Sequence, residues 1–199
     1  MPKRFDVKRQ RRAGESDEDE PEPEDCVVCD QDSIFFYSEV NTRSVVQLLK
    51  ALREAGNAAL ERCSWPSEAK IYLYIHSGGG DALAGLSAAD HIRCSRVPVV
   101  TIADGFVASA ATFMLCAGAE RKAFSSAKVL IHQISTSFYG RFAELQDELC
   151  NTSDLMTTMK SVYTTTTNMT ADEIEKLLKK EKHLNAGEAL QKGFVDEIW

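Results

Sequence analysis

Short apolar runs alternate with segments of helical periodicity, and this alternation constrains the fold of the chain more than any other feature. Runs typical of buried strands occupy residues 34–37, 70–75, 97–102 and 128–131. The intervening helical patterns occupy the stretch after Asn41, residues 82–93 and residues 109–116. Strands separated by helical crossovers pair in parallel. The pattern therefore predicts an α/β domain built on a largely parallel sheet.

The part of the chain after Gly140 is expected to be mainly helical. Apolar side chains recur there at three- and four-residue steps, at Phe142, Leu145, Leu149, Met156, Met159 and Tyr163. This spacing predicts one long helix. At 170–173 and again at 185–188, a capping residue is followed three positions later by glutamate, which predicts two further short helices.

The composition fits one folded domain preceded by a charged tail. The chain has 199 residues, of which 44% are hydrophobic, enough for a single core. Six basic residues between Lys3 and Arg12 are followed by an almost wholly acidic stretch from Glu15 to Asp25. Such a segment has little apolar surface to offset the entropy of ordering. We therefore expect residues 1–30 to be a disordered tail and residues 31–199 to form the domain.

Charge, hydropathy and cysteine usage disfavour several kinds of partner. A net charge of −7 is unlike that of a general nucleic-acid surface. No run approaches the ~18 apolar residues of a membrane span, and no signal-peptide core follows the basic start. Six cysteines are scattered, and the one close pair, Cys26 and Cys29, lacks the further ligands of a structural zinc site. We expect a soluble cytoplasmic protein with reduced cysteines and no metal, membrane or nucleic-acid partner.

Three polar segments follow predicted strands and should meet at the carboxyl edge of the sheet, where ligands collect in such folds. They are residues 77–80, residues 104–109 and His132. A serine hydroxyl becomes a nucleophile when a base accepts its proton and hydrogen-bond donors stabilise the oxyanion. Ser109 precedes a run of small residues, Gly78–Gly80 can aim amides into a cavity, and His132 can act as the base. Together these segments indicate nucleophilic catalysis.

Each of these residues has a plainer interpretation when it is taken alone. Ser109 can cap its helix, the glycines can form a tight turn, and His132 can be a buried core histidine. A phosphate-binding loop is disfavoured because the Lys-Ser/Thr pair of that motif does not follow the glycines. A histidine base also needs a carboxylate partner. The residues alone leave four candidates open, namely Asp104, Asp147, Asp172 and Glu181.

Five separated parts of the sequence resemble, in order, the proteolytic subunit of the Clp protease, a family of self-compartmentalised serine peptidases. They are 71–80 (IYLYIHSGGG), 103–109 (ADGFVAS), 117–119 (AGA), 131–133 (IHQ), and the closing LNAGEA at 184–189 with GFVD at 193–196. The likeness covers about Ile34 to Ile198. It implies the fold that Clp peptidases share with crotonases, a spiral of β-α-β units, with a protruding handle formed by residues 135–140 and the helix after them.

The resemblance implies a serine endopeptidase that cleaves unfolded polypeptides inside a homo-oligomer of stacked seven-membered rings. It implies no cofactor, and because the sequence has no nucleotide motif, ATP dependence would come from a separate AAA+ ATPase. Ser109 is then the nucleophile, His132 the general base, and the amides of Gly80 and Ala110 the oxyanion hole. Glu181 stands where the family has its third catalytic residue, an aspartate, and completes the implied triad.

Departures from the family pattern keep two other functions open. His76 and Gly78 replace the asparagine and proline of the family's glycine loop, and Glu181 replaces the aspartate. These changes are compatible with a catalytically inactive ring subunit. A crotonase-like enzyme that acts on acyl-thioesters would use a similar glycine loop but would not need Ser109 and His132 together.

Overall fold

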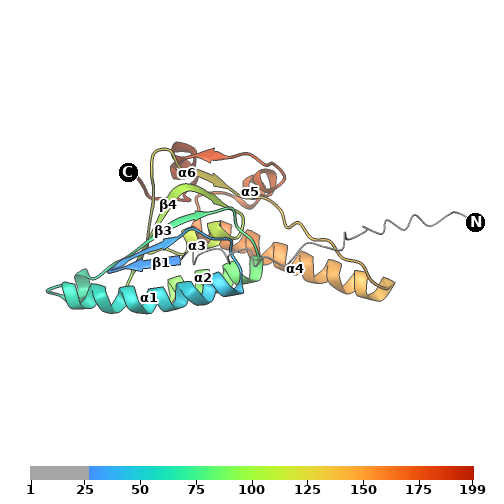
Figure 1. Ribbon diagram of the computed structural model, residues 1–199. Helices are drawn as coiled ribbons and strands as arrows, with labels where there is room; N and C mark the ends of the chain where they lie inside the picture. The colour runs from blue at the N-terminus through green and yellow to red at the C-terminus, as the bar shows by residue number, and fades with distance from the viewer. Residues whose placement is uncertain (1–26) are drawn as a thin grey trace, which may run out of the picture.

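Residues 27–199 are described by a computed structural model, and their central element is an eight-stranded sheet (Figure 1). The strands are β1 (Val27–Asp30), β2 (Ser33–Phe36), β3 (Ile71–Ser77), β4 (Val99–Ala108), β5 (Glu120–Ala123), β6 (Lys128–Leu130), β7 (Leu184–Asn185) and β8 (Glu197–Ile198). They follow the order β1-β2-β3-β4-β5-β8, with β6 beside β4 and β7 beside β6. Among these strands β1 and β2, and likewise β6 and β7, pair antiparallel, whereas the other pairs are parallel. The expected α/β fold with a parallel-rich sheet is confirmed.

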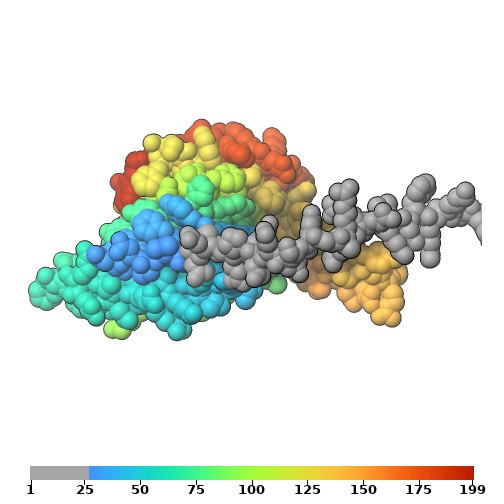
Figure 2. Space-filling model, viewed as in Figure 1, coloured from blue at the N-terminus to red at the C-terminus, as the bar shows by residue number. Residues whose placement is uncertain are grey.

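Six helices within the described residues pack around this sheet. They are α1 (Thr42–Arg62), α2 (Ala82–Arg93), α3 (Ala111–Cys116), α4 (Phe142–Thr166), α5 (Ala171–Leu178) and α6 (Ala186–Lys192), with a 3₁₀ turn, η1 (Pro66–Glu68), before β3. In Figure 1, α1 and α2 lie below the sheet, α5 and α6 lie above it, and α4 projects to one side. The projecting end of α4 stands clear of the body in the space-filling view (Figure 2). No helix between residues 27 and 199 is long and apolar enough to cross a bilayer.

Capping residues coincide with the ends of these helices. The side chain of Asn41 accepts a hydrogen bond from the N–H of Ser44 at the start of α1. Thr170 and Asn185 make the equivalent bonds for α5 and α6, which confirms the two capping patterns. Gly193 ends α6 in the left-handed conformation, with φ 80°. Local hydrogen bonds therefore set the limits of these helices.

The core lies where the helices pack on the central strands. On β3 the side chains of Ile71, Leu73 and Ile75 are fully buried, whereas Tyr72 and Tyr74, on the other face, are partly exposed. The first five residues of β4 are buried in succession, as expected for a central strand that is covered on both faces. This buried framework holds the carboxyl ends of β3 and β4 in place.

The structure differs from the sequence-based expectations in three places. β1 begins at Val27, before the expected boundary at residue 31, so that four residues assigned to the tail belong to the sheet; the rest of the expected tail, residues 1–26, lies outside the described residues. The helix expected at 109–116 begins at Ala111. Strands β5, β7 and β8 were not expected, because they are two to four residues long and β5 (ERKA) is mostly charged.

Candidate active site

The two reactive side chains leave neighbouring parallel strands at the same edge of the sheet. β4 contains Gly105, at φ 77°, and pairs with β5 before this residue and with β6 after it. Ala108, the last residue of β4, lies opposite Leu130, the last residue of β6. Ser109 therefore follows one strand end directly, and His132 follows the other by two residues. The parallel sheet alone explains why these two residues are close.

Ser109 occupies a turn between β4 and α3, at φ 53°, a left-handed conformation that residues other than glycine rarely adopt. Its N–H donates to the carbonyl of Leu130 (2.8 Å), and its carbonyl accepts from the N–H (2.9 Å) and the hydroxyl (2.6 Å) of Thr112. These bonds keep Ser109 outside the helix, which starts two residues later. A strained serine between a strand and a helix has the geometry of a nucleophile elbow. Within residues 27–199 its hydroxyl has no hydrogen-bond partner.

The glycine loop packs against the serine turn without room for side chains. A Cβ atom on Gly79 (φ 97°) would lie 2.6 Å from the Cβ of Ser109, and one on Gly80 (φ 146°) would lie 2.2 Å from the carbonyl oxygen of Val40. Non-bonded heavy atoms do not approach so closely, so both positions require glycine. In the described part of the chain, the N–H groups of Gly80 and Ala110 donate no hydrogen bond. They are therefore available to a negatively charged oxygen.

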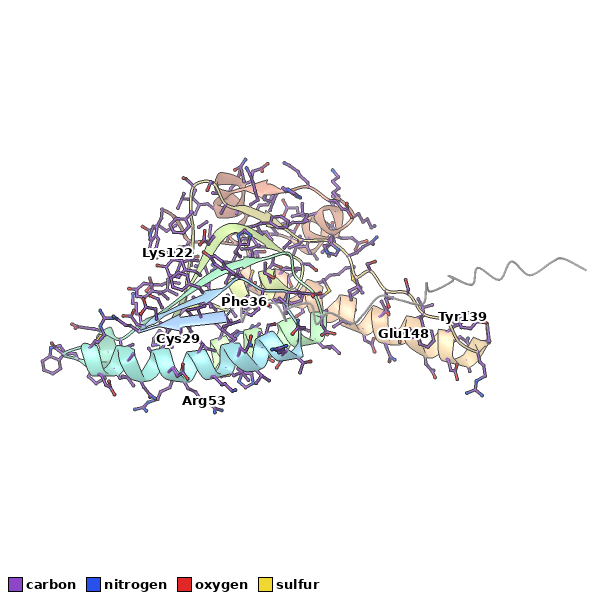
Figure 3. The ribbon with its side chains drawn as sticks, viewed as in Figure 1. Cys29, Phe36, Arg53, Lys122, Tyr139 and Glu148 are labelled. Carbon is purple, nitrogen blue, oxygen red and sulfur yellow. The ribbon has the colours of Figure 1, made fainter. Side chains whose placement is uncertain are left out.

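A cleft of about 740 Å³ opens beside the serine turn. Ser109, Ala110, His132 and Gly80 all line it, whereas Glu181 does not. Its other wall includes one stripe of α4, formed by Glu148, Thr152, Leu155 and Met159. Glu148 is labelled on the projecting half of α4 in Figure 3. The structure therefore brings four of the five expected site residues into one cavity, and its volume lies in the range of ligand sites.

His132 is partly buried, and its ring is hydrogen-bonded to the adjacent main chain. Nδ1 lies 2.6 Å from the backbone carbonyl oxygen of Gln133. A carbonyl oxygen can only accept, so this bond requires the proton on Nδ1, and the neutral ring then carries its lone pair on Nε2. This is the tautomer that a general base requires. No hydrogen bond between described residues joins His132 to Ser109 or to Glu181.

The four carboxylates that the sequence leaves open lie in different settings. Asp104 accepts a hydrogen bond from the hydroxyl of Tyr37. Burial, followed by this bond, raises the pKa of Tyr37 to about 12. Asp147 on α4 and Asp172 on α5 are exposed and lie outside the cleft. Glu181 is exposed in the loop between α5 and β7. None of the four faces His132 through a hydrogen bond within residues 27–199.

The main chain on both sides of Glu181 is nevertheless tied to the strand that leads to His132. On one side, the N–H of Gln133 donates to the carbonyl of Leu178 at 3.0 Å. On the other side, β6 and β7 pair antiparallel, with Val129 opposite Leu184. These two links hold the loop that contains Glu181 near the segment that contains His132.

Sequence reasoning missed three contributors to this region. Thr112 bonds to the carbonyl of Ser109, Tyr163 bonds to Thr112 at 2.7 Å, and Glu148 lines the cleft. Each left a signal in the sequence. Thr112 lies three residues after the serine, where a threonine hydroxyl reaches back to a carbonyl. Tyr163 lies four residues after Met159, and Glu148 lies eleven residues before it. Both spacings are close to whole helical turns, so the three residues share one face of the helix.

No group of three or more His, Cys, Asp or Glu side chains in residues 27–199 is arranged to hold a metal ion. Cys29, a residue of β1 that is labelled in Figure 3, points its Sγ toward the carbonyl of Ala51 on α1 at 3.7 Å. Burial is the main factor that raises the pKa of its thiol, so Cys29 is protonated at neutral pH. The other member of the cysteine pair, Cys26, lies outside the described residues.

A protein-family model, that of the Clp protease, matches residues 27–199 of the chain. The matched range contains every described strand and helix, and it therefore includes the glycine loop, the serine turn, His132 and α4. The match confirms the resemblance that the separated motifs indicated. It also begins at Val27, the first residue of β1.

Proposed function

Because the chain belongs to the Clp protease family, we propose that it is a serine endopeptidase that cleaves unfolded polypeptides. The observation that carries this proposal is the content of the cleft. A serine in a strained turn, a histidine with a free Nε2 and two unused backbone amides line one cavity. An acyl-transfer site needs a nucleophile, a base and oxyanion donors around a single carbonyl group. Peptide hydrolysis uses all of them.

In the proposed reaction, Nε2 of His132 accepts the hydroxyl proton as Oγ of Ser109 attacks the scissile carbonyl carbon. The N–H groups of Gly80 and Ala110 donate to the oxyanion that forms. The imidazolium of His132 then gives its proton to the leaving amine, and the C–N bond breaks to leave an ester on Ser109. Water, deprotonated by the same histidine, hydrolyses the ester and restores the serine.

We propose Glu181 as the carboxylate that stabilises the imidazolium. The ladder between β6 and β7 supports this choice, and so does the bond from Gln133 to Leu178, because the two hold the loop that contains Glu181 near the segment that contains His132. For a direct contact, Nδ1 of His132 exchanges the carbonyl of Gln133 for this carboxylate. Both acceptors select the same tautomer, so the exchange leaves Nε2 as the base.

One observation favours a second candidate, a catalytically inactive ring subunit. The hydrogen bond of His132 goes to Gln133, and no described hydrogen bond links it to Ser109 or Glu181. A subunit that stays in this arrangement would lack a stabilised imidazolium. Peptide hydrolysis by the purified chain alone separates the two candidates, because only the peptidase turns over substrate without a partner subunit.

We also propose that the chain assembles into stacked rings through α4, with a AAA+ ATPase partner that supplies unfolded substrates. The exposed apolar side chains on and before α4 support the assembly: Tyr139 is 100% exposed, Phe142 75% and Leu149 72%. Side chains of this kind are usually covered when they cluster. Figure 3 labels Tyr139 near the tip of this projection.

The test is hydrolysis of a fluorogenic peptide amide with an apolar residue before the scissile bond. We expect Ser109→Ala and His132→Ala each to lower kcat/KM by ~10³-fold or more, because the pair acts as a unit. Glu181→Gln should lower kcat at least ~10-fold and Glu181→Asp should retain most of it. An acyl-thioester enzyme would keep its activity in Ser109→Ala. Undiminished peptide hydrolysis in that variant would contradict the proposal.

A further inference from the structure

A buried pair of hydroxyl groups connects α4 to the turn that carries Ser109. Tyr163, on α4, is fully buried, with its ring against Phe113 (5.6 Å between centroids) and Phe194 (6.0 Å). Its hydroxyl lies 2.7 Å from Oγ1 of Thr112, which is also fully buried. Burial raises the pKa of Tyr163 far above its ordinary value, so the hydroxyl stays protonated.

The direction of the hydrogen bonds in this pair follows from the number of protons. Thr112 has one hydroxyl proton, and it donates this proton to the carbonyl oxygen of Ser109 at 2.6 Å, because a carbonyl can only accept. Oγ1 of Thr112 is then the acceptor for the hydroxyl of Tyr163. The chain of bonds runs Tyr163 to Thr112 to Ser109. If the hydroxyl of Tyr163 or of Thr112 is removed, the buried hydroxyl of the other residue loses a hydrogen-bond partner.

The bonds end at the residue with the strained backbone. The carbonyl of Ser109 also accepts from the N–H of Thr112 at 2.9 Å, so two donors hold the peptide unit that follows φ 53°. The same peptide unit carries the N–H of Ala110, one of the two proposed oxyanion donors. Its orientation therefore affects the nucleophile and the oxyanion hole together.

We propose that Tyr163 and Thr112 are positioning residues for Ser109. They hold the serine turn in its left-handed conformation and tie it to α4, the helix that also supplies Leu155 and Met159 to the cleft. A role in packing alone requires only the ring of Tyr163, because a phenylalanine fills nearly the same volume. The proposed positioning role belongs to the two hydroxyl groups. Their effect on catalysis rests on the proposed peptidase activity, whereas their effect on the turn does not.

The variants that test this are Tyr163→Phe and Thr112→Val, which remove one hydroxyl each, and Thr112→Ser, which keeps it. We expect the first two to lower kcat, and the rate of Ser109 acylation by a fluorophosphonate, about tenfold with KM changed less than twofold. Thr112→Ser should recover most of the loss. Tyr72→Phe, which removes a hydroxyl from the far face of β3, is the matched control and should behave as the unmodified chain. Unchanged kcat and acylation in both Tyr163→Phe and Thr112→Val would overturn the proposal.

Hydrogen–deuterium exchange provides a readout that does not depend on catalysis. The amide of Thr112, which donates to Ser109, should exchange about tenfold faster in Tyr163→Phe than in the unmodified chain, with no change for amides in β3. If the unmodified protein hydrolyses no peptide but this local difference is present, the proposed function fails and the positioning role stands. Equal exchange in the two proteins contradicts the positioning role whether or not the chain is a peptidase.

Discussion

Ser109 holds a backbone conformation that costs on the order of 1–3 kcal/mol for a residue other than glycine. The structure compensates with bonds from Thr112 and to Leu130, and with the close approach of Gly79. Because these contacts surround the serine, small changes at its neighbours should affect activity more than stability. The neighbour most sensitive to substitution is Gly79, because its lack of a Cβ allows the glycine loop to pack against Ser109.

We predict that Gly79→Ala lowers kcat/KM by about 100-fold or more, because the new Cβ must displace the serine turn. The same clash, 2.6 Å from the Cβ of Ser109, should destabilise the fold by about 1–3 kcal/mol. Gly78→Ala is the control for stability, since a Cβ there meets nothing within 4 Å. Thermal unfolding and peptide hydrolysis of both variants provide the measurement. Equal unfolding midpoints for the two variants would contradict the account.

At this scale the sequence predicted where the reactive residues lie, but it did not predict their conformation. Ser109, His132 and the glycines follow strands of one parallel sheet, so topology alone placed them together. The left-handed turn depends on Leu130 and Thr112, and the run of small residues after Ser109 resembles an ordinary helix start. The residues alone could not select the acid that would partner His132, because that choice depends on the path of the loops and not on any local pattern.

At the scale of elements, α4 contributes both to the core and to the wall of the cleft. Its inner end is core, where Met159 and Tyr163 are buried. A second stripe, from Glu148 to Met159, lines the cleft. The apolar spacing predicted the helix correctly, but not that Phe142 and Leu149 would be exposed, since periodicity identifies an apolar face without identifying what covers it.

The charges that line the cleft predict a preference among substrates. Glu39, Asp81 and Glu148 line it, and no lysine or arginine does within the described residues. We expect peptides with a lysine within reach of Glu148 to have kcat/KM about fivefold above glutamate analogues, which corresponds to about 1 kcal/mol. Glu148→Gln should lower this ratio at least twofold. Asp147→Asn, which removes a charge one residue away but outside the cleft, should leave the ratio unchanged. A ratio that is equal in all three proteins would contradict this prediction.

At the scale of the whole molecule, the apolar residues on the outer part of α4 support the proposed assembly. Phe142, Leu145 and Leu149 lie at three- and four-residue steps, so they share one face of the helix. All three are exposed in the single chain. This exposed apolar face supports the proposed contact with further copies, because burial of each such side chain would contribute about 1.5–3 kcal/mol.

We predict that Leu149→Glu reduces the assembly to smaller species, because a charge would be buried in the contact. Light scattering coupled to size-exclusion chromatography measures the mass. Asn151→Glu places the same charge on the opposite face of α4 and should leave the mass unchanged. A monomeric unmodified chain, or an unchanged mass for Leu149→Glu, would contradict the role of this face.

The proposed catalysis depends most directly on the partnership between Ser109 and His132. Its test is to react the purified, folded protein with a fluorophosphonate and to map the adduct by tandem mass spectrometry. We predict one adduct, on Ser109, that forms at least ~100-fold more slowly in His132→Ala, because the serine then lacks its base. A folded oligomer that forms no adduct on Ser109, or that forms it equally fast without the imidazole, would contradict the account.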